Sequence, residues 1–264
     1  MKRISSYLAL AASYFQLNLK AQLEYRGAFL SQALAMFLNN IAWVAFWGLF
    51  FHRFPVLRGW TMHDFITLWA VVAAGFGLAH SVFGNALLLP SLIARGQLDA
   101  WLLYPRAALP HLLLGRMSAT ACGDAAFGYL VYLAVVKPDL QHFLLFTAFT
   151  VSAAMAFVGF SVLTGSLSFY LGNAEALSEQ WRFAMITFST YPATLFEGTV
   201  KLLLYTLIPA AFVGYLPVEA LRSLSAADAA LAVTGSAAIL VLGACVFHLG
   251  LTRYESGNLM EMRG

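Results

Sequence analysis

Long apolar runs separated by short polar segments are the main pattern of this chain. A helix needs about 20 mostly apolar residues to cross the hydrocarbon core of a bilayer. We expect spans at about 27–51, 65–83, 109–136, 143–167, 182–191 and 229–251. The pattern therefore predicts an all-α polytopic membrane protein with six transmembrane helices, organised as a single domain over residues 1–264.

Two further segments are apolar without forming a regular span. In residues 1–22 the apolar positions recur at helical spacing, which predicts an amphipathic helix in the membrane interface. An ordinary N-terminal helix with frayed ends is the alternative. Residues 193–221 are interrupted by Glu197, Lys201 and two prolines, so we expect a re-entrant helical hairpin in the outer leaflet. A full crossing there would place Arg253 on the outer side, against the charge bias.

The basic residues support this topology. With both ends of the chain in the cytoplasm, two thirds of the fifteen basic residues fall on the inner side, as the positive-inside rule requires. The inner group is Lys2, Arg3, Lys20, Arg26, Arg95, Arg106, Arg116, Arg182, Arg253 and Arg263. The outer group is Arg53, Arg58, Lys137, Lys201 and Arg222.

Composition narrows the function classes. The chain is 61% hydrophobic and 10% charged, whereas a soluble domain is about 25% charged. A net charge of +3, dispersed over the loops, gives no basic surface for nucleic acid. Cys122 and Cys245 lie inside apolar runs, which favours neither a disulfide framework nor a zinc site. Membrane lipid is therefore an expected partner, and nucleic acid is not.

Residues 84–106 form the most polar stretch between two spans. Pro90 favours a new helix directly after it, Gly96 can end that helix, and Pro105 separates the segment from the next span. We expect a short amphipathic helix on the cytoplasmic face that presents Arg95 and Asp99. In the simpler interpretation Arg95 is a positive-inside anchor and Asp99 a helix cap.

Three short motifs indicate a family. The segment Gly96-Gln97-Leu98-Asp99-Ala100-Trp101-Leu102-Leu103-Tyr104-Pro105 resembles the G-x-L-D-x-x-L-L-x-P signature of ABC-2 type permeases. Ile208-Pro209-Ala210-Ala211-Phe212 and Tyr254-Glu255-Ser256-Gly257-Asn258 resemble the Ile-Pro-x-x-Phe stretch and the tail of a poorly characterised bacterial branch of them. The resemblance covers nearly the whole chain, because the spans, the interfacial helix and the hairpin also agree with the family plan.

The resemblance implies a function and partners. The chain would be the permease subunit of an exporter in the bacterial inner membrane, paired with a second permease that is the same or a related chain. A pair of cytoplasmic ABC ATPase subunits would bind ATP and Mg²⁺. The loop at 84–106 resembles a coupling helix, so the expected ATPase-docking residues are Arg95, Gly96, Gln97, Leu98 and Asp99.

The sequence contains none of the common catalytic motifs. It has no G-x-x-x-x-G-K-[ST] loop, no H-E-x-x-H and no G-x-S-x-G, so we expect neither ATP hydrolysis nor another enzyme activity on this chain. No catalytic residue and no metal site is predicted.

Three charged residues within apolar segments are further candidates. Asp124 lies inside the third span, where a charge costs about 2.5–3.5 kcal/mol on insertion scales. It would line the pathway, seal a subunit contact, or be protonated. Glu197 and Lys201 are four residues apart, so they can pair on one helical face, either to stabilise the break or as an extracellular gate.

Two other function classes remain open. A secondary transporter driven by an ion gradient would need paired intramembrane carboxylates and inverted repeats. A lipid-modifying enzyme in the membrane would need His, Asp or Ser clustered at one depth. We find neither pattern, and the sequence does not define the substrate.

Overall fold

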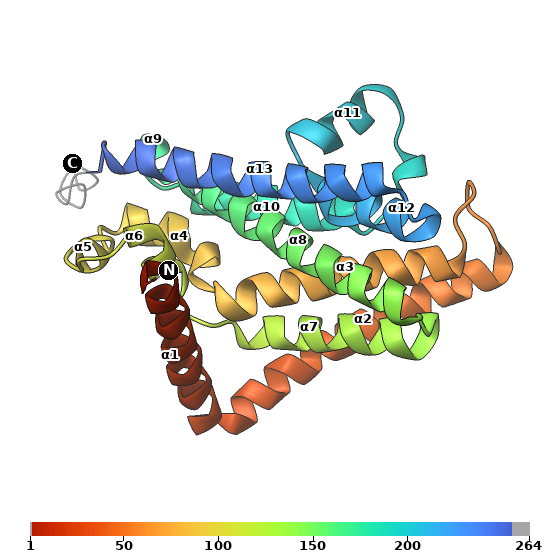
Figure 1. Ribbon diagram of the computed structural model, residues 1–264, viewed down its shortest axis with the longest axis horizontal. Coiled ribbons are helices and arrows are strands. Elements are labelled where there is room, and N and C mark those ends of the chain that lie inside the picture. The colour runs from red at the N-terminus through yellow and green to blue at the C-terminus, as the bar shows by residue number, and fades with distance from the viewer. Residues whose placement is uncertain (1, 255–264) are drawn as a thin grey trace.

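The computed structural model describes residues 2–254, with side chains from residue 9 onward except that of residue 193. Within that range the chain forms helices and one isolated bridge, with no strand. The expected all-α polytopic architecture is confirmed. The bundle (Figure 1) is built from α2 (Arg26–Arg53), α3 (Met62–Val82), α7 (Ala119–Val131) with the π-helix η1 (Tyr132–Val136), α8 (Leu140–Gly165), α10 (Glu175–Ser189) and α13 (Ala226–Leu251).

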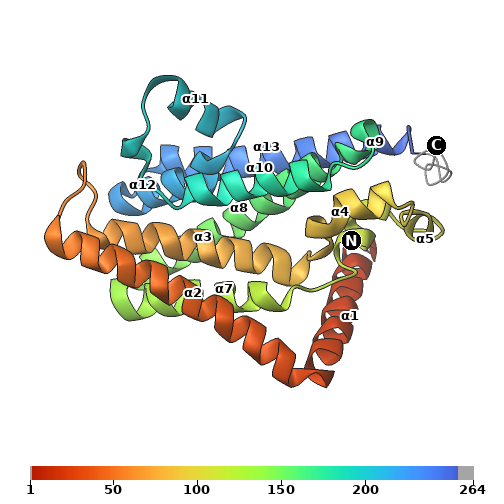
Figure 2. The same ribbon diagram turned by 180° about the vertical axis from the view of Figure 1, so that it is seen from behind.

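Shorter helices lie at the two ends of this bundle (Figures 1 and 2). One end, here called the α5 end, holds α4 (Asn85–Ala94), α5 (Asp99–Leu102), α6 (Ala108–Leu113) and α9 (Ser168–Leu171). The other end, called the α12 end, holds the loop between α2 and α3, η2 (Ala193–Leu195), α11 (Gly198–Thr206), η3 (Ala211–Tyr215) and α12 (Leu216–Ser223). Helix α1 (Lys2–Glu24) begins at the α5 end and runs across the bundle axis.

Five helices are long and apolar enough to cross a membrane, and a bent pair brings the number up to six. The five are α2, α3, α7 with η1, α8 with its extension through α9, and α13. The bent pair consists of 198–206 and 211–223, whose axes differ by 80°. The interruption expected at 193–221 is therefore present, while re-entry into the outer leaflet stays a prediction.

The third span is shorter than expected. It begins at Ala119, because residues 108–113 form the separate helix α6 and residues 114–118 leave the bundle axis. Two backbone hydrogen bonds hold this break against the preceding helices, from Gly84 N–H to the Arg116 carbonyl at 2.9 Å and from Ser118 N–H to the His80 carbonyl at 3.1 Å. The prediction of one helix from residue 109 was wrong because apolar composition alone does not reveal such tertiary pairing.

The fifth expected span is also different. Helix α10 begins at Glu175, seven residues before the expected entry at Arg182, and its first half is polar. It has 15 residues, or about 22 Å at 1.5 Å per residue, which is shorter than the hydrocarbon core. It nevertheless runs alongside α8 from the α5 end toward the α12 end (Figure 2).

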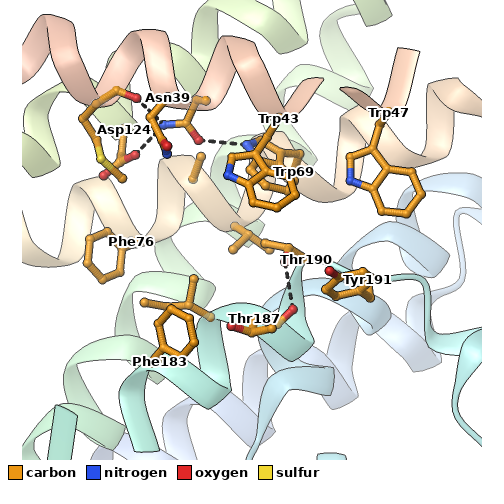
Figure 3. Close-up of a pocket in the computed structure, with 15 residues that line it drawn as sticks. Asn39, Trp43, Trp47, Trp69, Phe76, Asp124, Phe183, Thr187, Thr190 and Tyr191 are labelled. Atoms are coloured by element: carbon orange, nitrogen blue, oxygen red, sulfur yellow. Dashed lines mark hydrogen bonds between the residues drawn. The ribbon is translucent and has the colours of Figure 1, made fainter. Parts of the chain in front are cut away.

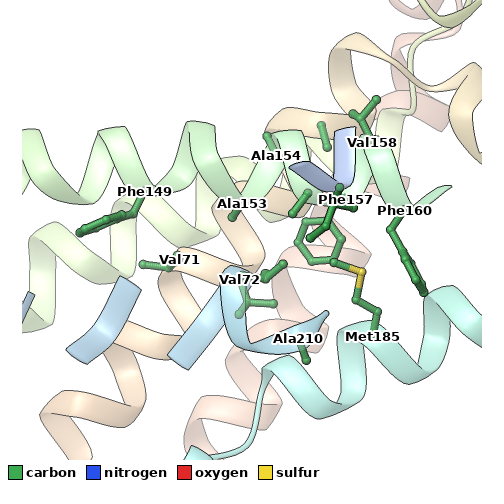
Figure 4. Close-up of a cluster of buried hydrophobic side chains, with 14 of the residues drawn as sticks. Val71, Val72, Phe149, Ala153, Ala154, Phe157, Val158, Phe160, Met185 and Ala210 are labelled. Atoms are coloured by element: carbon green, nitrogen blue, oxygen red, sulfur yellow. The ribbon is translucent and has the colours of Figure 1, made fainter. Parts of the chain in front are cut away.

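The core of the bundle surrounds α3. Of its apolar span 72% is buried, against 17% for α2 and 22% for α13. Side chains of α3, α8 and α10 interlock around Phe157, Val72 and Met185 (Figure 4). Gly77 brings α3 and α7 into backbone contact, because an added Cβ would overlap the backbone of Ala125. The outer faces of α2 and α13 remain apolar and exposed, as suits contact with lipid tails.

Candidate functional site

The loop at 84–106 is a structured element of the α5 end. Helix α4 ends in a Schellman motif: Gly96 N–H donates to the Ile93 carbonyl at 3.1 Å, and Gln97 N–H to the Leu92 carbonyl at 2.9 Å. The motif needs a residue with positive φ, and Gly96 has φ +68°. The expected helix end at Gly96 is thus confirmed.

The start of that helix was predicted wrongly. Helix α4 begins at Asn85, so Pro90 lies inside it instead of before it. A proline inside a helix costs about 3 kcal/mol or more because it removes one backbone hydrogen bond. Ala86 and Leu89 are both fully buried against the core, and this packing offsets the cost.

The predicted docking residues differ in exposure. Arg95, Gln97 and Asp99 are exposed and Gly96 is half-buried, whereas Leu98 is only 2% exposed. The Leu98 side chain therefore anchors the loop in the core and offers no surface to a partner.

Sequence reasoning missed an apolar surface next to these residues. Leu102, Leu103 and Tyr104 are 42%, 86% and 55% exposed at the tip of the loop. The signal was present in the sequence as an apolar triplet inside a polar segment. These three residues and the exposed Arg95, Gln97 and Asp99 of the same loop are here called the loop tip, which combines charge with apolar area.

The C-terminal tail motif meets this loop. The Tyr254 hydroxyl is buried beside the Asp99 carboxylate, and burial, with a smaller contribution from Asp99, raises the pKa of Tyr254 to about 12. Arg253 stacks over the ring of Tyr170 at 5.0 Å. Two motifs that are far apart in the sequence therefore come together at the α5 end. The other tail residues, 255–258, lie outside the described range.

Helix α1 is joined to the same end of the bundle. The Tyr14 hydroxyl lies 2.5 Å from Nε2 of His111 in α6, and the Asn18 amide donates to the Leu114 carbonyl at 3.3 Å. The rings of Trp101 and Tyr104 pack edge-on against His111, at 5.2 and 4.7 Å. Burial lowers the pKa of His111, and Arg106 adds to this effect. His111 thus links α1, α6 and the loop tip.

A second candidate region is a cavity of about 520 Å³ between α2, α3 and α10 (Figure 3). Asp124 of α7 lines it and is 3% exposed. Asn40 of α2 donates to Asp124 Oδ1 at 2.6 Å and accepts from the Trp69 indole at 2.8 Å. The other oxygen, Asp124 Oδ2, is buried and has no hydrogen-bond partner.

The local structure explains how Asp124 reaches α2. An added Cβ on Gly123 would overlap the Ala33 carbonyl, so this glycine allows α7 and α2 to approach closely. The partner Asn40 was missed by sequence reasoning, although the Asn39-Asn40 pair interrupts an apolar run and so marked the position. Asp124 lies on the wall of the cavity, as it would if it lined a transport pathway. Its functional role stays a prediction.

The outer candidates form a different pair from the one expected. Glu197 lies before α11 and pairs with Arg58 at 2.6 Å, with side chains 78% and 54% exposed. Gly198, with φ +58°, begins the helix after Glu197, so Glu197 and Lys201 do not share a helical face. The expected Glu197–Lys201 pairing was wrong for this reason. In addition, Arg58 donates to the Thr194 carbonyl at 2.8 Å.

No three His, Cys, Asp or Glu side chains in residues 9–254 are placed to hold a metal ion. The structure is a bundle of candidate membrane-spanning helices with a cavity and a structured loop at one end. The family model described as "ABC-2 family transporter protein" matches residues 37–257. The chain therefore belongs to the ABC-2 transporter family and is an ABC transporter permease. No curated protein and no solved structure matches it.

Proposed function

We propose that this chain is the permease subunit of an ATP-driven exporter and that its loop tip docks onto a cytoplasmic ATPase subunit. The supporting observation is the composition of the loop tip, where Arg95, Gln97 and Asp99 are exposed in the same loop as the exposed Leu103. Exposed apolar side chains together with charged ones are typical of a protein–protein contact. The predicted docking set thereby gains Leu102, Leu103 and Tyr104, and Leu98 supports it from below.

Two permeases, identical or related, would assemble above two ATPase subunits, which would bind ATP and Mg²⁺. The membrane would be the bacterial cytoplasmic membrane, with the α5 end in the cytoplasm and both termini there. This orientation is supported by the sequence, which has ten basic residues on the expected inner side against five on the outer side; the inner group includes Arg95, Arg106, Arg116 and Arg253.

Transport would follow from closure of the ATPase subunits. Their movement would push on the loop tip, and the contacts of His111 and Tyr254 would carry the push to α1, α6 and α13. The cavity beside Asp124 would then open outward past the Arg58–Glu197 pair, which serves as the extracellular gate with Lys201 nearby in α11. An ion-driven secondary transporter is the alternative to this mechanism.

The test is affinity purification of the tagged chain in mild detergent, followed by mass spectrometry. We expect an ATPase with a Walker-type loop to remain bound to the wild-type chain and to be lost from the double variant Arg95→Ala/Asp99→Ala. The matched control is Arg58→Ala/Glu197→Ala, which removes an exposed pair of the same charges at the α12 end and should retain the ATPase.

A stable wild-type particle without any ATPase, in several detergents and in lipid discs, would contradict the proposal and favour the ion-driven alternative. A second, related permease in the same sample would establish a heterodimer.

A further inference from the structure

The cavity beside Asp124 opens sideways between α2 and α10. At its mouth Trp43 is 43% exposed and Phe183 is 63% exposed, whereas Trp47 and Trp69 on the inner walls are at most 9% exposed (Figure 3). Its volume of about 520 Å³ lies within the usual range of sites for small organic molecules. A molecule dissolved in the membrane would meet this mouth directly.

The cavity presents one strong acceptor without a donor. The Asn40 side-chain amide donates to Asp124 Oδ1, and the Asn40 side-chain carbonyl accepts from the Trp69 indole. Asn40 therefore holds the carboxylate in one orientation. Asp124 Oδ2 is left buried and unpartnered. A buried acceptor of this kind costs free energy unless a donor reaches it, and a carboxylate most of all.

In the part of the chain whose side chains are described, no lysine, arginine or histidine forms an ion pair with Asp124. Arg182, which precedes Phe183 in α10, interacts electrostatically with Glu175 and Glu179 instead. A cationic ligand would supply both the missing donor and a complementary charge.

The walls suit a cation that carries an apolar body. Trp43 and Trp69 are stacked, with ring centroids 5.9 Å apart, and Trp47 and Tyr191 continue the aromatic wall with centroids at 6.0 Å. Aromatic side chains bury a large apolar area, so these walls suit the apolar body of the ligand, while Asp124 takes its charge.

We propose that this cavity binds an amphiphilic amine. Its protonated nitrogen donates to Asp124 Oδ2, its apolar body packs between the tryptophans, and Asn40 is the positioning residue for the carboxylate. The inference rests on the proposed transport function, because it names the substrate class of the same cavity.

The probe is 1-naphthylmethylamine, compared with 1-naphthylmethanol, which has the same aromatic body and no positive charge. Both are titrated into the purified permease alone in lipid nanodiscs, and binding to empty nanodiscs is subtracted. We expect the wild-type protein to prefer the amine over the alcohol by about tenfold or more. The Asp124→Asn variant, which keeps the size of the side chain, should bind the two probes equally.

Two further variants separate charge from packing. Trp43→Leu removes an exposed part of the wall, so it should weaken both probes by a similar factor and keep their ratio. Glu175→Gln removes a negative charge from the exposed start of α10 and should change neither affinity.

Equal affinity of the two probes for the wild-type protein would overturn the proposal, as would a preference for the amine that survives in Asp124→Asn. If Asp124→Asn fails to fold, the wild-type ratio and the Trp43→Leu series still decide the question. The measurement contains no ATPase, so its failure leaves the ATPase-docking proposal untouched, and loss of ATPase binding leaves this result untouched.

Discussion

The two ends of the bundle hold their segments together in different ways. At the α5 end the links are buried or half-buried contacts between distant parts of the chain. Tyr14 of α1 contacts His111 of α6, and Tyr254 after α13 packs beside Asp99. These contacts join the first helix, the loop and the last helix into one unit.

At the α12 end two ion pairs lie beside buried apolar packing, in which Val213 of η3 and Val218 of α12 are fully buried. Arg58 and Glu197 are both exposed, and Arg222 pairs with Asp64 at 3.2 Å across the start of α3. Exposed ion pairs contribute only about 0–1 kcal/mol each, because water and salt screen them. The Arg58–Glu197 contact can therefore open at little cost while η3 and α12 stay packed in the core, whereas the contacts at the α5 end are buried or half-buried. The difference suits a molecule that is pushed at one end and releases cargo at the other.

The largest effect is expected from Leu103→Asp. This change puts a charge in the middle of the loop tip and should reduce recovery of the ATPase by about tenfold or more, as for an interface hot spot. Mass spectrometry of the purified complex measures it. Val56→Asp is the matched control, since Val56 is also exposed, at 59%, but lies in the loop between α2 and α3 at the α12 end. Equal loss of ATPase recovery in both variants would show that docking is not specific to the α5 end.

The next effect comes from the two glycines with positive φ. Gly96→Ala and Gly198→Ala introduce similar strain, because the residues have φ +68° and +58°. Each should lower the free energy of unfolding by about 1–2 kcal/mol. Only Gly96→Ala should also weaken ATPase recovery, because it alone tilts the loop tip. Thermal unfolding and mass spectrometry on the same samples compare the two variants.

A smaller, pH-dependent effect is expected at His111. Its pKa is lowered by burial, so the unfolded chain binds the proton more readily than the folded one. The stability that neutral His111 contributes is complete above the unfolded pKa of about 6.5 and is lost as the pH falls toward the folded pKa. The melting temperature of the wild-type protein should therefore fall more steeply below pH 6.5 than that of His111→Phe. Parallel curves would show that His111 does not titrate in this way.

The smallest effect on stability is expected at the α12 end. Glu197→Gln should change the free energy of unfolding by less than about 1 kcal/mol, because both partners are exposed. It should nevertheless raise transport-independent leakage of a small probe through liposomes if the pair is a gate. Lys137→Gln is the control, because Lys137 is an exposed basic residue at the same end outside the gate, and it should leave leakage unchanged. Leakage equal to that of the wild-type protein would show that the Arg58–Glu197 pair is not a gate.

The sequence predicted a polytopic membrane protein, because the length of each apolar run can be read locally along the chain. The spans at α2, α3, α8 and α13, and the helix end at Gly96, follow from runs of apolar residues and from one backbone requirement. The boundaries at Pro90 and Ala119 did not follow, because burial of Ala86 and Leu89 and the backbone bonds of Ser118 and Gly84 decide them.

The candidate site shows the same limit. Asp124 stood out because a carboxylate inside an apolar run is rare, but its partner Asn40 depends on how closely α2 and α7 approach at Gly123. The Glu197 pairing failed because a single positive φ at Gly198 moves Glu197 off the helix. Neither the close approach of two helices nor the backbone conformation at one glycine can be read from the spacing of residues.

The most direct test of the central claim is photo-crosslinking in the intact membrane. A benzoylphenylalanine residue is placed at Gln97 in the loop tip and, in a separate protein, at Lys201 in α11; both positions are exposed. We predict a crosslink from position 97 to an ATPase with a Walker-type loop, and none from position 201. No ATPase adduct at position 97, together with full labelling by lipid or solvent there, would contradict it.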